Sequence, residues 1–245
     1  MTGVRERARA ELTVEIKAIA RRQMAVDGPA NLSLRAVARE LGMVSSAIYR
    51  YFPSRDLLLT ALIVDAYNEL GELAEVTDAS IESRDVLERW NALGWATYRW
   101  AVDAPSQYSL LFGTPVPGYR APDDTIGPAT RFTSVLARLL DDVASAGGGP
   151  VVAPTVPAVL APDVERLRQL TGTSMDDATF LAGMQAWTAM FGLISFVLFG
   201  QLHNVVDDHD DFVRMSIDLI GRQVVGQQNV RQQGTGRRRR AVQTA

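Results

Sequence analysis

Serine, tyrosine and arginine side chains crowd into one short stretch of the chain, MVSSAIYRYFPSRDLL, which covers residues 43–58. Hydroxyl groups donate or accept hydrogen bonds at bases and phosphates, and an arginine guanidinium binds guanine or phosphate. Small residues at the start of a short helix also let that helix enter the major groove, which is roughly 12 Å wide. The stretch therefore has the chemistry of a surface that binds duplex DNA. The residues expected on its outer face are Ser45, Ser46, Ala47, Tyr49 and Arg50.

Two short helices, over residues 33–41 and 45–51, are expected to position these side chains. Ser33 and Ser45 are candidate N-caps, and Gly42 suits the left-handed conformation that often follows a helix. The pair of helices predicts a helix-turn-helix, although two such helices also occur incidentally in helical bundles. The positions predicted to be buried are Leu34, Val37, Ala38, Leu41, Val44 and Ile48.

Apolar residues recur with a helical period along most of the chain, and no strand pattern is found. We therefore predict an all-α fold with an N-terminal three-helix helix-turn-helix domain. Pro53 and Ser54 are expected to begin the long helix that follows it, with an apolar face starting at Leu57. The predicted domains are residues 1–56, a larger helical domain at 57–227 and a basic tail at 228–245. The other predicted helices cover 5–26, 57–75, 81–102, 130–145, 176–206 and 208–226, and a Gly/Pro-rich loop is predicted over 146–162.

Charge is segregated along the chain. Residues 1–56 carry +4, residues 57–230 carry −12 and residues 231–245 carry +5. Because an acidic surface repels a polyanion, any contact with nucleic acid is expected at the two ends. The basic run Arg237–Arg240 leaves two interpretations open, nonspecific attraction to phosphate or no role at all.

Several classes of site are not indicated by the sequence. The chain has no cysteine, which excludes disulfides and thiolate chemistry, and its charged N-terminus lacks the apolar core of a secretory signal. No phosphate-binding glycine loop or nucleophile and base set is found, so we predict no catalytic residues and no cofactor. His203, Asp207 and His209 could be drawn as a metal set, but solvated helix ends explain them better, and no metal site is predicted. A cytoplasmic location is expected.

The segment LSLRAVARELGMVSSAIYRYFPSRDLL resembles the N-terminal domain of the TetR family of bacterial transcriptional regulators. The matching positions are Ala38, Gly42, Tyr49, Phe52, Pro53, Ser54, Arg55, Asp56 and Leu57. The resemblance implies an all-α homodimer with a DNA-binding head and a larger body that binds a ligand and dimerises. It also implies that Ser33 and Tyr51 contact phosphates and that Arg55 reaches the phosphate backbone.

A second segment, AWTAMFGLISF at residues 186–196, resembles the Trp-x-x-x-His-Gly signature of one TetR C-terminal subgroup. Phe191 stands where that signature has histidine, so a ligand role of the histidine cannot carry over. The resemblance implies a ligand-responsive regulator, and we expect a repressor that a small, largely apolar effector releases from a palindromic operator.

Aromatic residues of the larger domain have two interpretations, the wall of an apolar effector pocket or ordinary core. Arg99 either binds an anionic group of the effector or pairs with Asp103. The candidate effector residues are Trp90, Trp95, Tyr98, Arg99, Tyr108, Phe112, Trp187 and Phe191.

Residues 178–202 carry no charge and are long enough to span a bilayer. Acidic residues flank the segment on both sides and no basic cluster would fix its orientation, which argues against a membrane span. We expect instead that the helices near 176–206 and 208–226 form the homodimer interface. A membrane-associated helical protein using 178–202 as a span is the alternative.

Overall fold

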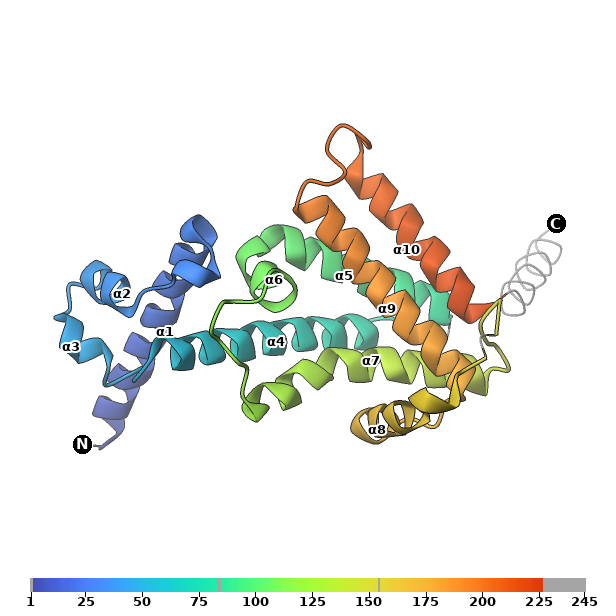
Figure 1. Cartoon of the computed structure of the whole chain (residues 1–245), viewed down its shortest axis with the longest axis horizontal. Coiled ribbons are helices and arrows are strands. Elements are labelled where there is room, and N and C mark those ends of the chain that lie inside the picture. The colour runs from blue at the N-terminus through green and yellow to red at the C-terminus, as the bar shows by residue number, and fades with distance from the viewer. Residues whose placement is uncertain (1, 83–84, 154, 227–245) are drawn as a thin grey trace, which may run out of the picture. The chain divides into compact units, whose positions relative to one another are not determined.

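Helices make up almost all regular structure of the chain (Figure 1). The computed structural model describes residues 2–82, 85–153 and 155–226, and within these ranges it contains no strand. The predicted tail at 228–245, with Arg237–Arg240, lies outside the described residues. The α-helices are α1 (Thr2–Asp27), α2 (Leu34–Glu40), α3 (Ser45–Ile48), α4 (Arg55–Ala79), α5 (Val86–Asp103), α6 (Pro105–Phe112), α7 (Ile126–Ser145), α8 (Ala161–Thr171), α9 (Asp177–Leu198) and α10 (His209–Val225). Three 3-10 turns join them, η1 (Pro29–Asn31), η2 (Asp123–Thr125) and η3 (Ala158–Leu160).

The chain divides into two structural units. Unit 1 contains the chain up to Glu69 together with Asp103–Ala129, and unit 2 contains Leu70–Val102 and the residues from Thr130 onward. Helix α4 therefore contributes residues to both units. Unit 1 includes α6 and the loop after it, segments that our sequence-based domain limits place in the larger domain.

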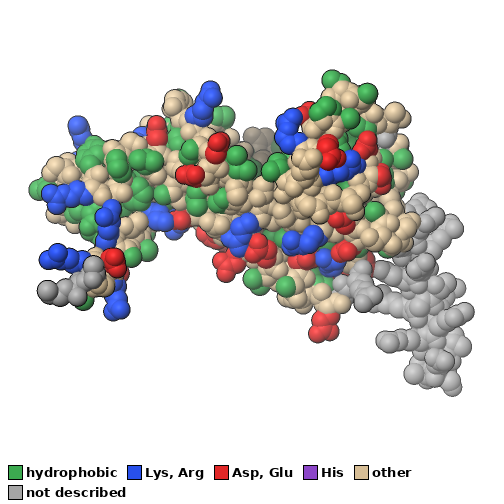
Figure 2. All heavy atoms as spheres, turned by 90° about the horizontal axis from the view of Figure 1, so that it is seen from below, with side chains coloured by type: hydrophobic (Ala, Val, Ile, Leu, Met, Phe, Trp, Pro, Cys, Tyr) green, Lys and Arg blue, Asp and Glu red, His purple; other side chains and the backbone are tan. Residues whose placement is uncertain are grey.

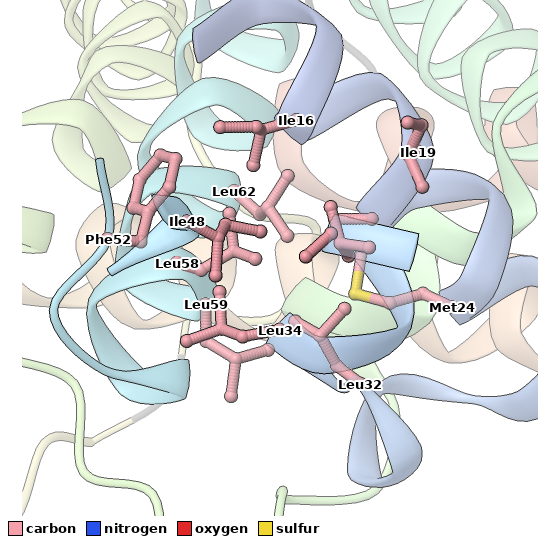
Figure 3. Close-up of a cluster of buried hydrophobic side chains, with 13 residues drawn as sticks. Ile16, Ile19, Met24, Leu32, Leu34, Ile48, Phe52, Leu58, Leu59 and Leu62 are labelled. Atoms are coloured by element: carbon pink, nitrogen blue, oxygen red, sulfur yellow. The ribbon is translucent and has the colours of Figure 1, made fainter. Parts of the chain in front are cut away.

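An apolar core holds unit 1 together (Figure 3). Ile16 and Ile19 project from α1, Ile48 from α3, and Leu58 and Leu62 from α4, and all five are at most 3% exposed. The spacing of Ile16 and Ile19 places them on one face of α1, as an amphipathic helix requires. This packing anchors α3 to the core through Ile48, while Ser45 and Ser46 on its other side stay exposed.

The ends of the short helices follow local capping chemistry. The Ser33 hydroxyl accepts a hydrogen bond from the Ala36 amide at 3.4 Å, and the Ser54 hydroxyl accepts one from the Leu57 amide at 3.1 Å. Gly42 has φ +66°, the left-handed conformation expected after α2. The predicted roles of Ser33 and Ser54 at helix starts and the glycine turn at Gly42 are thus confirmed.

Helix α3 begins and ends differently from the prediction. Val44 occupies the N-cap position, so the prediction that Ser45 caps this helix is wrong. The helix closes at Ile48 instead of residue 51, because the amide of Tyr51 donates to the carbonyl of Ile48 at 2.9 Å and tightens the chain into turns. These turns precede Pro53, which has no backbone N–H and so cannot donate the hydrogen bond that would continue a helix.

The segment after α6 packs against the core of unit 1. Val116 and Tyr119 lie against that core, and the Tyr119 hydroxyl is 2.9 Å from the Thr60 hydroxyl on α4. Helix α6 was not predicted, because its eight residues are too few for a clear period. The loop and α6 therefore extend the helix-turn-helix core beyond the three helices expected.

Unit 2 is built mainly from α5, α7, α9 and α10, with α8 packed beside α7 and α9. Helix α9 ends at Leu198, earlier than the predicted residue 206, and a turn with φ +78° at Gly200 and +61° at Asn204 leads to α10. Helix α5 begins at Val86 and not at residue 81. The chain is irregular over residues 146–153 and 155–157 apart from its turns, and α8 was not predicted.

Candidate functional site

Helix α3 presents a small polar face on the surface of unit 1. Ser45, Ser46 and Arg50 are exposed, Tyr49 is 42% exposed, and Ile48 on the opposite side is fully buried. The four-residue helix, anchored by Ile48, and the turn after it thus carry hydroxyl and guanidinium groups outward, with Tyr49 and Arg50 in the turn. Ala47 is half-buried, so it contributes space more than contact. The structure brings all five predicted groove residues to one short element.

Val44 lies beside this face and not in the core. Its side chain is 72% exposed, so the prediction that it is buried is wrong. The residue is the N-cap of α3 and lies outside the helical period, and Met43 packs against the core in its place. An exposed branched methyl pair at this position suits contact with a thymine methyl group. A helix that starts at Ser45 leaves Val44 outside the helical period, and this signal could have identified Val44 as exposed.

Ser33 and Tyr51, the predicted phosphate contacts, have structural partners of their own. The hydroxyl of Ser33 caps α2, and the ring of Tyr51 packs partly against the core. The Arg9 guanidinium of α1 lies 5.8 Å from the centre of the Tyr51 ring, and its Nη2 donates to the carbonyl of Arg50 at 3.2 Å. Sequence reasoning did not identify Arg9, since it lies far from the motif in the chain.

Arg55 uses its guanidinium inside unit 1. Its Nε donates to the Leu32 carbonyl at 3.2 Å, and its Nη2 donates to the carbonyls of Pro29 and Ala30 at 3.1 and 2.8 Å. These bonds join the start of α4 to η1 and to the residue before the α2 cap. Phosphate contact by Arg55 stays a prediction, and the geometry gives this residue a positioning role first.

Replacing Arg55 with alanine is expected to loosen the α2 entry. Hydrogen bonds to a charged group each contribute about 1.5–3 kcal/mol, and this group is only partly exposed, so we expect a loss of about 2 kcal/mol in local stability. Amide hydrogen exchange over residues 28–42 should become roughly thirtyfold faster. Arg55→Lys should recover only part of the protection because an ammonium group cannot reproduce the planar fork. Unchanged exchange with weaker DNA binding would support the phosphate role instead.

The predicted effector residues divide between the two units. Six lie in unit 2, whereas Tyr108 and Phe112 lie in unit 1, where Phe112 stacks edge-on with Tyr67 at 6.5 Å. Tyr108 is fully buried. In unit 2, Phe191 contacts Trp187 and Phe132, with ring centres 5.9 and 5.5 Å apart.

Trp90 joins α5 to α10. Its indole Nε1 donates to the Ile217 carbonyl at 2.9 Å, and the side chain is 6% exposed. Gly221 lies so close to the indole that a Cβ there would clash with it. Trp90 also lines a cavity of about 20 Å³ between α5, α7, α9 and α10, which has room for about one water molecule. A drug-sized ligand pocket is of order 300–1,000 Å³, so an effector at this place would have to push the helices apart.

Tyr98 and Arg99 share a partner on α10. The Tyr98 hydroxyl donates to the Asp210 carboxylate at 2.9 Å, and the Arg99 Nη1 lies 3.8 Å from the other oxygen of Asp210. Burial and this hydrogen bond raise the pKa of Tyr98 to about 12, so the phenol remains a neutral donor at physiological pH. The sequence offered Asp103 as a partner of Arg99, and Asp210 is a partner that the sequence did not indicate. Trp95 lies under the Arg214 guanidinium, 3.3 Å from its ring centre.

One side of α9 and α10 is uncovered within unit 2 and exposes several large apolar side chains among polar ones. The exposed residues of α9 recur every three or four positions and so form a stripe along the helix. Phe196 on this stripe is 54% exposed. On α10, Met215 and Leu219 are 61% and 56% exposed. A groove of about 460 Å³ runs between the two helices, bordered also by Pro150, Val151 and Val152. The α9 stripe consists of Gln185, Thr188, Ala189, Gly192, Phe196 and Phe199.

Helix α9 is also long and apolar enough to cross a membrane. Its 22 residues contain an 18-residue window of mean hydropathy 1.6, of which 33% is buried. Core helices of other proteins pass the same test, which makes one such helix weak evidence for a span. The buried part of α9 packs into unit 2 through residues such as Met190 and Ile194.

Two models of protein families match the chain. Residues 16–62 match the family described as "Bacterial regulatory proteins, tetR family", a match that runs from the second half of α1 into α4. Residues 90–220 match "Tetracyclin repressor-like, C-terminal domain". The second match extends from Trp90 to the last turns of α10 and so includes the apolar face of α9 and α10.

Curated relatives support the same assignment. The chain is 40% identical over 218 residues to the HTH-type transcriptional regulator Rv1816 of Mycobacterium tuberculosis, covering 81% of this chain and 86% of the relative. The regulator Mb1846 of Mycobacterium bovis gives the same values.

Solved structures share the fold over nearly the whole chain. The putative regulatory protein SCO4313 superimposes with a TM-score of 0.71 at 31% identity, covering 88% of this chain and 97% of that one. The TetR family transcriptional regulator PfmR from Thermus thermophilus superimposes with a TM-score of 0.57 at 18% identity, covering 84% of this chain and 97% of the PfmR chain. At this low identity the likeness shows the fold alone.

Proposed function

The chain belongs to the TetR family of bacterial transcriptional regulators, and from that premise we propose that it is a homodimeric repressor which a small, largely apolar effector releases from a palindromic operator. As a member it has a helix-turn-helix DNA-binding domain and a C-terminal ligand-binding domain. The observation that carries the proposal is the exposed Ser45, Ser46, Tyr49 and Arg50 face on a helix whose other side is fixed in the core. A regulator of this kind acts in the cytoplasm.

Sequence recognition is assigned to α3 and to Val44 before it. Small serine side chains let the helix enter the major groove, and Tyr49 and Arg50 extend toward base edges and phosphates. Ser33 and Tyr51 are proposed as phosphate contacts at the edges of this surface. Arg55 is proposed to hold α2 in place through its three carbonyl contacts, with any phosphate contact secondary.

The apolar face of α9 and α10 is proposed as the dimer interface. Exposed apolar surface of this extent on adjacent helices is rare on monomers and typical of subunit contacts. A second copy related by a two-fold axis would place α9 and α10 against their counterparts in a four-helix arrangement. The glycine and alanine in the α9 stripe would allow close approach of the helices.

The membrane interpretation is not favoured. A lone lipid-facing helix would be apolar on its exposed side, but the exposed stripe of α9 includes Gln185 and Thr188, and the exposed face of α10 beside it carries Arg222 and Gln223. Separation of cell extracts tests the point. The protein should remain in the aqueous fraction as a dimer without detergent.

Repression and release follow from a shift between two conformations. An effector changes DNA affinity only to the degree that it prefers one conformation, and tenfold release needs about 1.4 kcal/mol of differential affinity. We place effector binding among the aromatic residues of unit 2, with Trp90 at the helix junction that would have to open.

Tyr49→Ala is expected to weaken specific binding while leaving the dimer intact. Tyr49 is exposed on α3 and contributes little to the core, so the variant should fold normally. Loss of a base contact should cost about 1–3 kcal/mol on an operator and little on random duplex. Equilibrium binding to a genomic fragment selected by the protein, beside a shuffled duplex of equal length, measures both quantities.

Tyr49→Phe provides the matched control because it removes only the hydroxyl. Retained specificity in this variant would assign the contact to the ring, and loss would assign it to the hydroxyl. An equal loss of affinity of Tyr49→Ala for both duplexes would contradict a role in sequence recognition.

The function itself is tested by the ratio of specific to nonspecific binding. A regulator of this class binds its operator about 10³–10⁷ times more tightly than random DNA at physiological salt. If the purified protein bound selected genomic fragments no better than shuffled duplex, the proposed function would be refuted.

A further inference from the structure

The first three turns of α1 extend beyond the core of unit 1. Every residue from Gly3 to Glu11 is exposed, and the first residue of α1 that packs against the core is Leu12. A helical segment of this length with no core contact gains little stability from packing. Any role of this segment therefore depends on its exposed side chains.

The core-facing stripe of α1 continues into this segment as arginine. Arg9 lies seven residues and Arg5 eleven residues before Ile16, offsets that deviate from whole turns by about 20°. Both side chains thus share the face that, farther along, packs under α3 and α4. Arg7 lies nine residues before Ile16, which places it about half a turn away, on the opposite face.

The two faces of α1 carry different charges. Glu11 lies five residues before Ile16, about 140° around the helix, on the side that also carries Arg7, and Glu6 lies about 80° around, between the two faces. The face that continues toward α3 therefore carries the basic Arg5 and Arg9, with the acidic residues of this segment beside it and behind it. Figure 2 shows Lys and Arg side chains standing out over the part of unit 1 formed by α1, α2 and α3.

Arg9 connects this face directly to the proposed DNA surface. Its Nη2 donates to the carbonyl of Arg50, the last residue of the α3 face, and its guanidinium lies 5.8 Å from the Tyr51 ring. A guanidinium has five N–H donors, so this one bond leaves others directed outward. Arg5 lies four residues before Arg9 on the same face of α1, about 6 Å farther along the helix axis.

Ion pairs on the rest of α1 hold the helix in register. Lys17 and Arg21 both bind Asp65 of α4, at 2.8 and 2.9 Å. Because α4 also carries Leu58 and Leu62 of the core, α1 is tied to the element that positions α3. The arginines at its start are thus presented on a fixed support.

We propose that Arg5 and Arg9 bind the phosphate backbone of duplex DNA, outside the segment that α3 reads. The inference rests on the proposed DNA-binding function and deepens it, since it adds a contact surface which the helix-turn-helix motif does not include. The phosphates of each strand advance 3.4 Å per base pair along the duplex, so two guanidiniums about 6 Å apart can engage different phosphates. These contacts add affinity and register without reading sequence.

The test compares Arg5→Ala/Arg9→Ala with Arg7→Ala in the full-length protein. Affinity for a 40-base-pair random-sequence duplex is measured by fluorescence anisotropy between 50 and 200 mM KCl. Each lost phosphate contact lowers the slope of log affinity against log salt by about 0.9, so a dimer that loses four contacts should lose about 3.6. Over this fourfold change in salt the wild type should therefore lose about 150-fold more affinity than the double variant. Arg7→Ala, which removes the same charge from the opposite face, should keep the wild-type slope.

Hydroxyl-radical footprinting on a selected genomic fragment provides the second measurement. The double variant should lose protection of sugars flanking the central site while protection at the site itself persists. Far-ultraviolet circular dichroism should show equal helix content in all three proteins.

The outcomes separate the two proposals. Wild-type protein that fails to bind any duplex would overturn the proposed function. Wild-type protein that binds, with a double variant whose salt slope and footprint match those of Arg7→Ala, would overturn the inference alone.

Discussion

Replacing Phe196 and Leu219 together with glutamate is expected to convert the dimer into monomers and to leave only weak operator binding. Both side chains lie on the apolar face of α9 and α10 and are more than half exposed in the single chain. In a two-fold dimer each substitution occurs twice, so the interface would bury four carboxylates, at a cost of several kcal/mol per ion. The dissociation constant should rise at least about a thousandfold. Analytical ultracentrifugation across protein concentration measures it directly.

Leu170→Glu is the matched control for the substitution at residue 219. Leu170 on α8 is 51% exposed, close to the 56% of Leu219, but it lies outside the α9 and α10 face. This variant should remain dimeric and bind operator normally. Dissociation of the Leu170→Glu variant, or a dimeric Phe196→Glu/Leu219→Glu variant, would show that the subunits meet elsewhere.

Loss of operator binding in the monomer has a geometric cause. A two-fold operator presents two half-sites, and a dimer engages both with one loss of translational and rotational freedom. A monomer with an intact α3 should keep only weak binding. Because the helix-turn-helix of the double variant is unchanged, its operator affinity also measures how far DNA binding depends on dimerisation.

Trp90→Ala is expected to be the most destabilising substitution of a single residue in unit 2. The indole is 6% exposed, donates to the Ile217 carbonyl and borders an existing small cavity. Truncating a buried tryptophan costs about 3–5 kcal/mol because it combines lost burial with a new cavity. Urea unfolding followed by circular dichroism should show the lower midpoint at an unchanged slope.

Two variants separate the contributions at Trp90. Trp90→Phe keeps most of the ring and loses the hydrogen bond, so about 1–2 kcal/mol should be lost. Trp95→Ala on the same helix removes a partly exposed ring that contacts Arg214, and a loss near 1 kcal/mol is expected. A larger loss for Trp95→Ala than for Trp90→Ala would contradict the assignment of Trp90 as the junction between α5 and α10.

The fold class and most helices could be predicted because they depend on local signals. Ser33, Gly42 and Ser54 determine helix ends through their own backbone or hydroxyl groups, and a single sequence displays such residues directly. The missed helices α6 and α8 have 8 and 11 residues, too short for a period to stand out among prolines and glycines. Their stability comes from tertiary packing, which periodicity does not reveal.

The DNA surface was predictable to the degree that helical period decides exposure. Ser45, Ser46, Tyr49 and Arg50 are exposed as expected and Ala47 is half-buried, whereas Val44 was assigned to the core by extending the period of α3 one residue too far. Arg9 and the carbonyl contacts of Arg55 join residues 41 and 23–26 positions apart, and no local pattern encodes such pairings. The contact of Arg99 with Asp210 was not predicted for the same reason, since Asp210 lies on another helix.

The effector site was the least predictable part of the molecule. Aromatic residues are compatible with both core and pocket, and the structure shows Trp90 and Tyr108 tightly packed. Whether they also touch an effector depends on a conformation in which the helices of unit 2 separate. Sequence composition does not distinguish a core that opens from one that stays closed.

The central claim is that this protein recognises a symmetric operator through two copies of α3. Selection of genomic DNA fragments by the purified, full-length protein tests it most directly. We predict recovered fragments that share an inverted repeat, with half-site centres separated by about 34–36 Å or a multiple of that distance. Recovery of fragments with no shared sequence, or of a single half-site without its inverted partner, would contradict the claim.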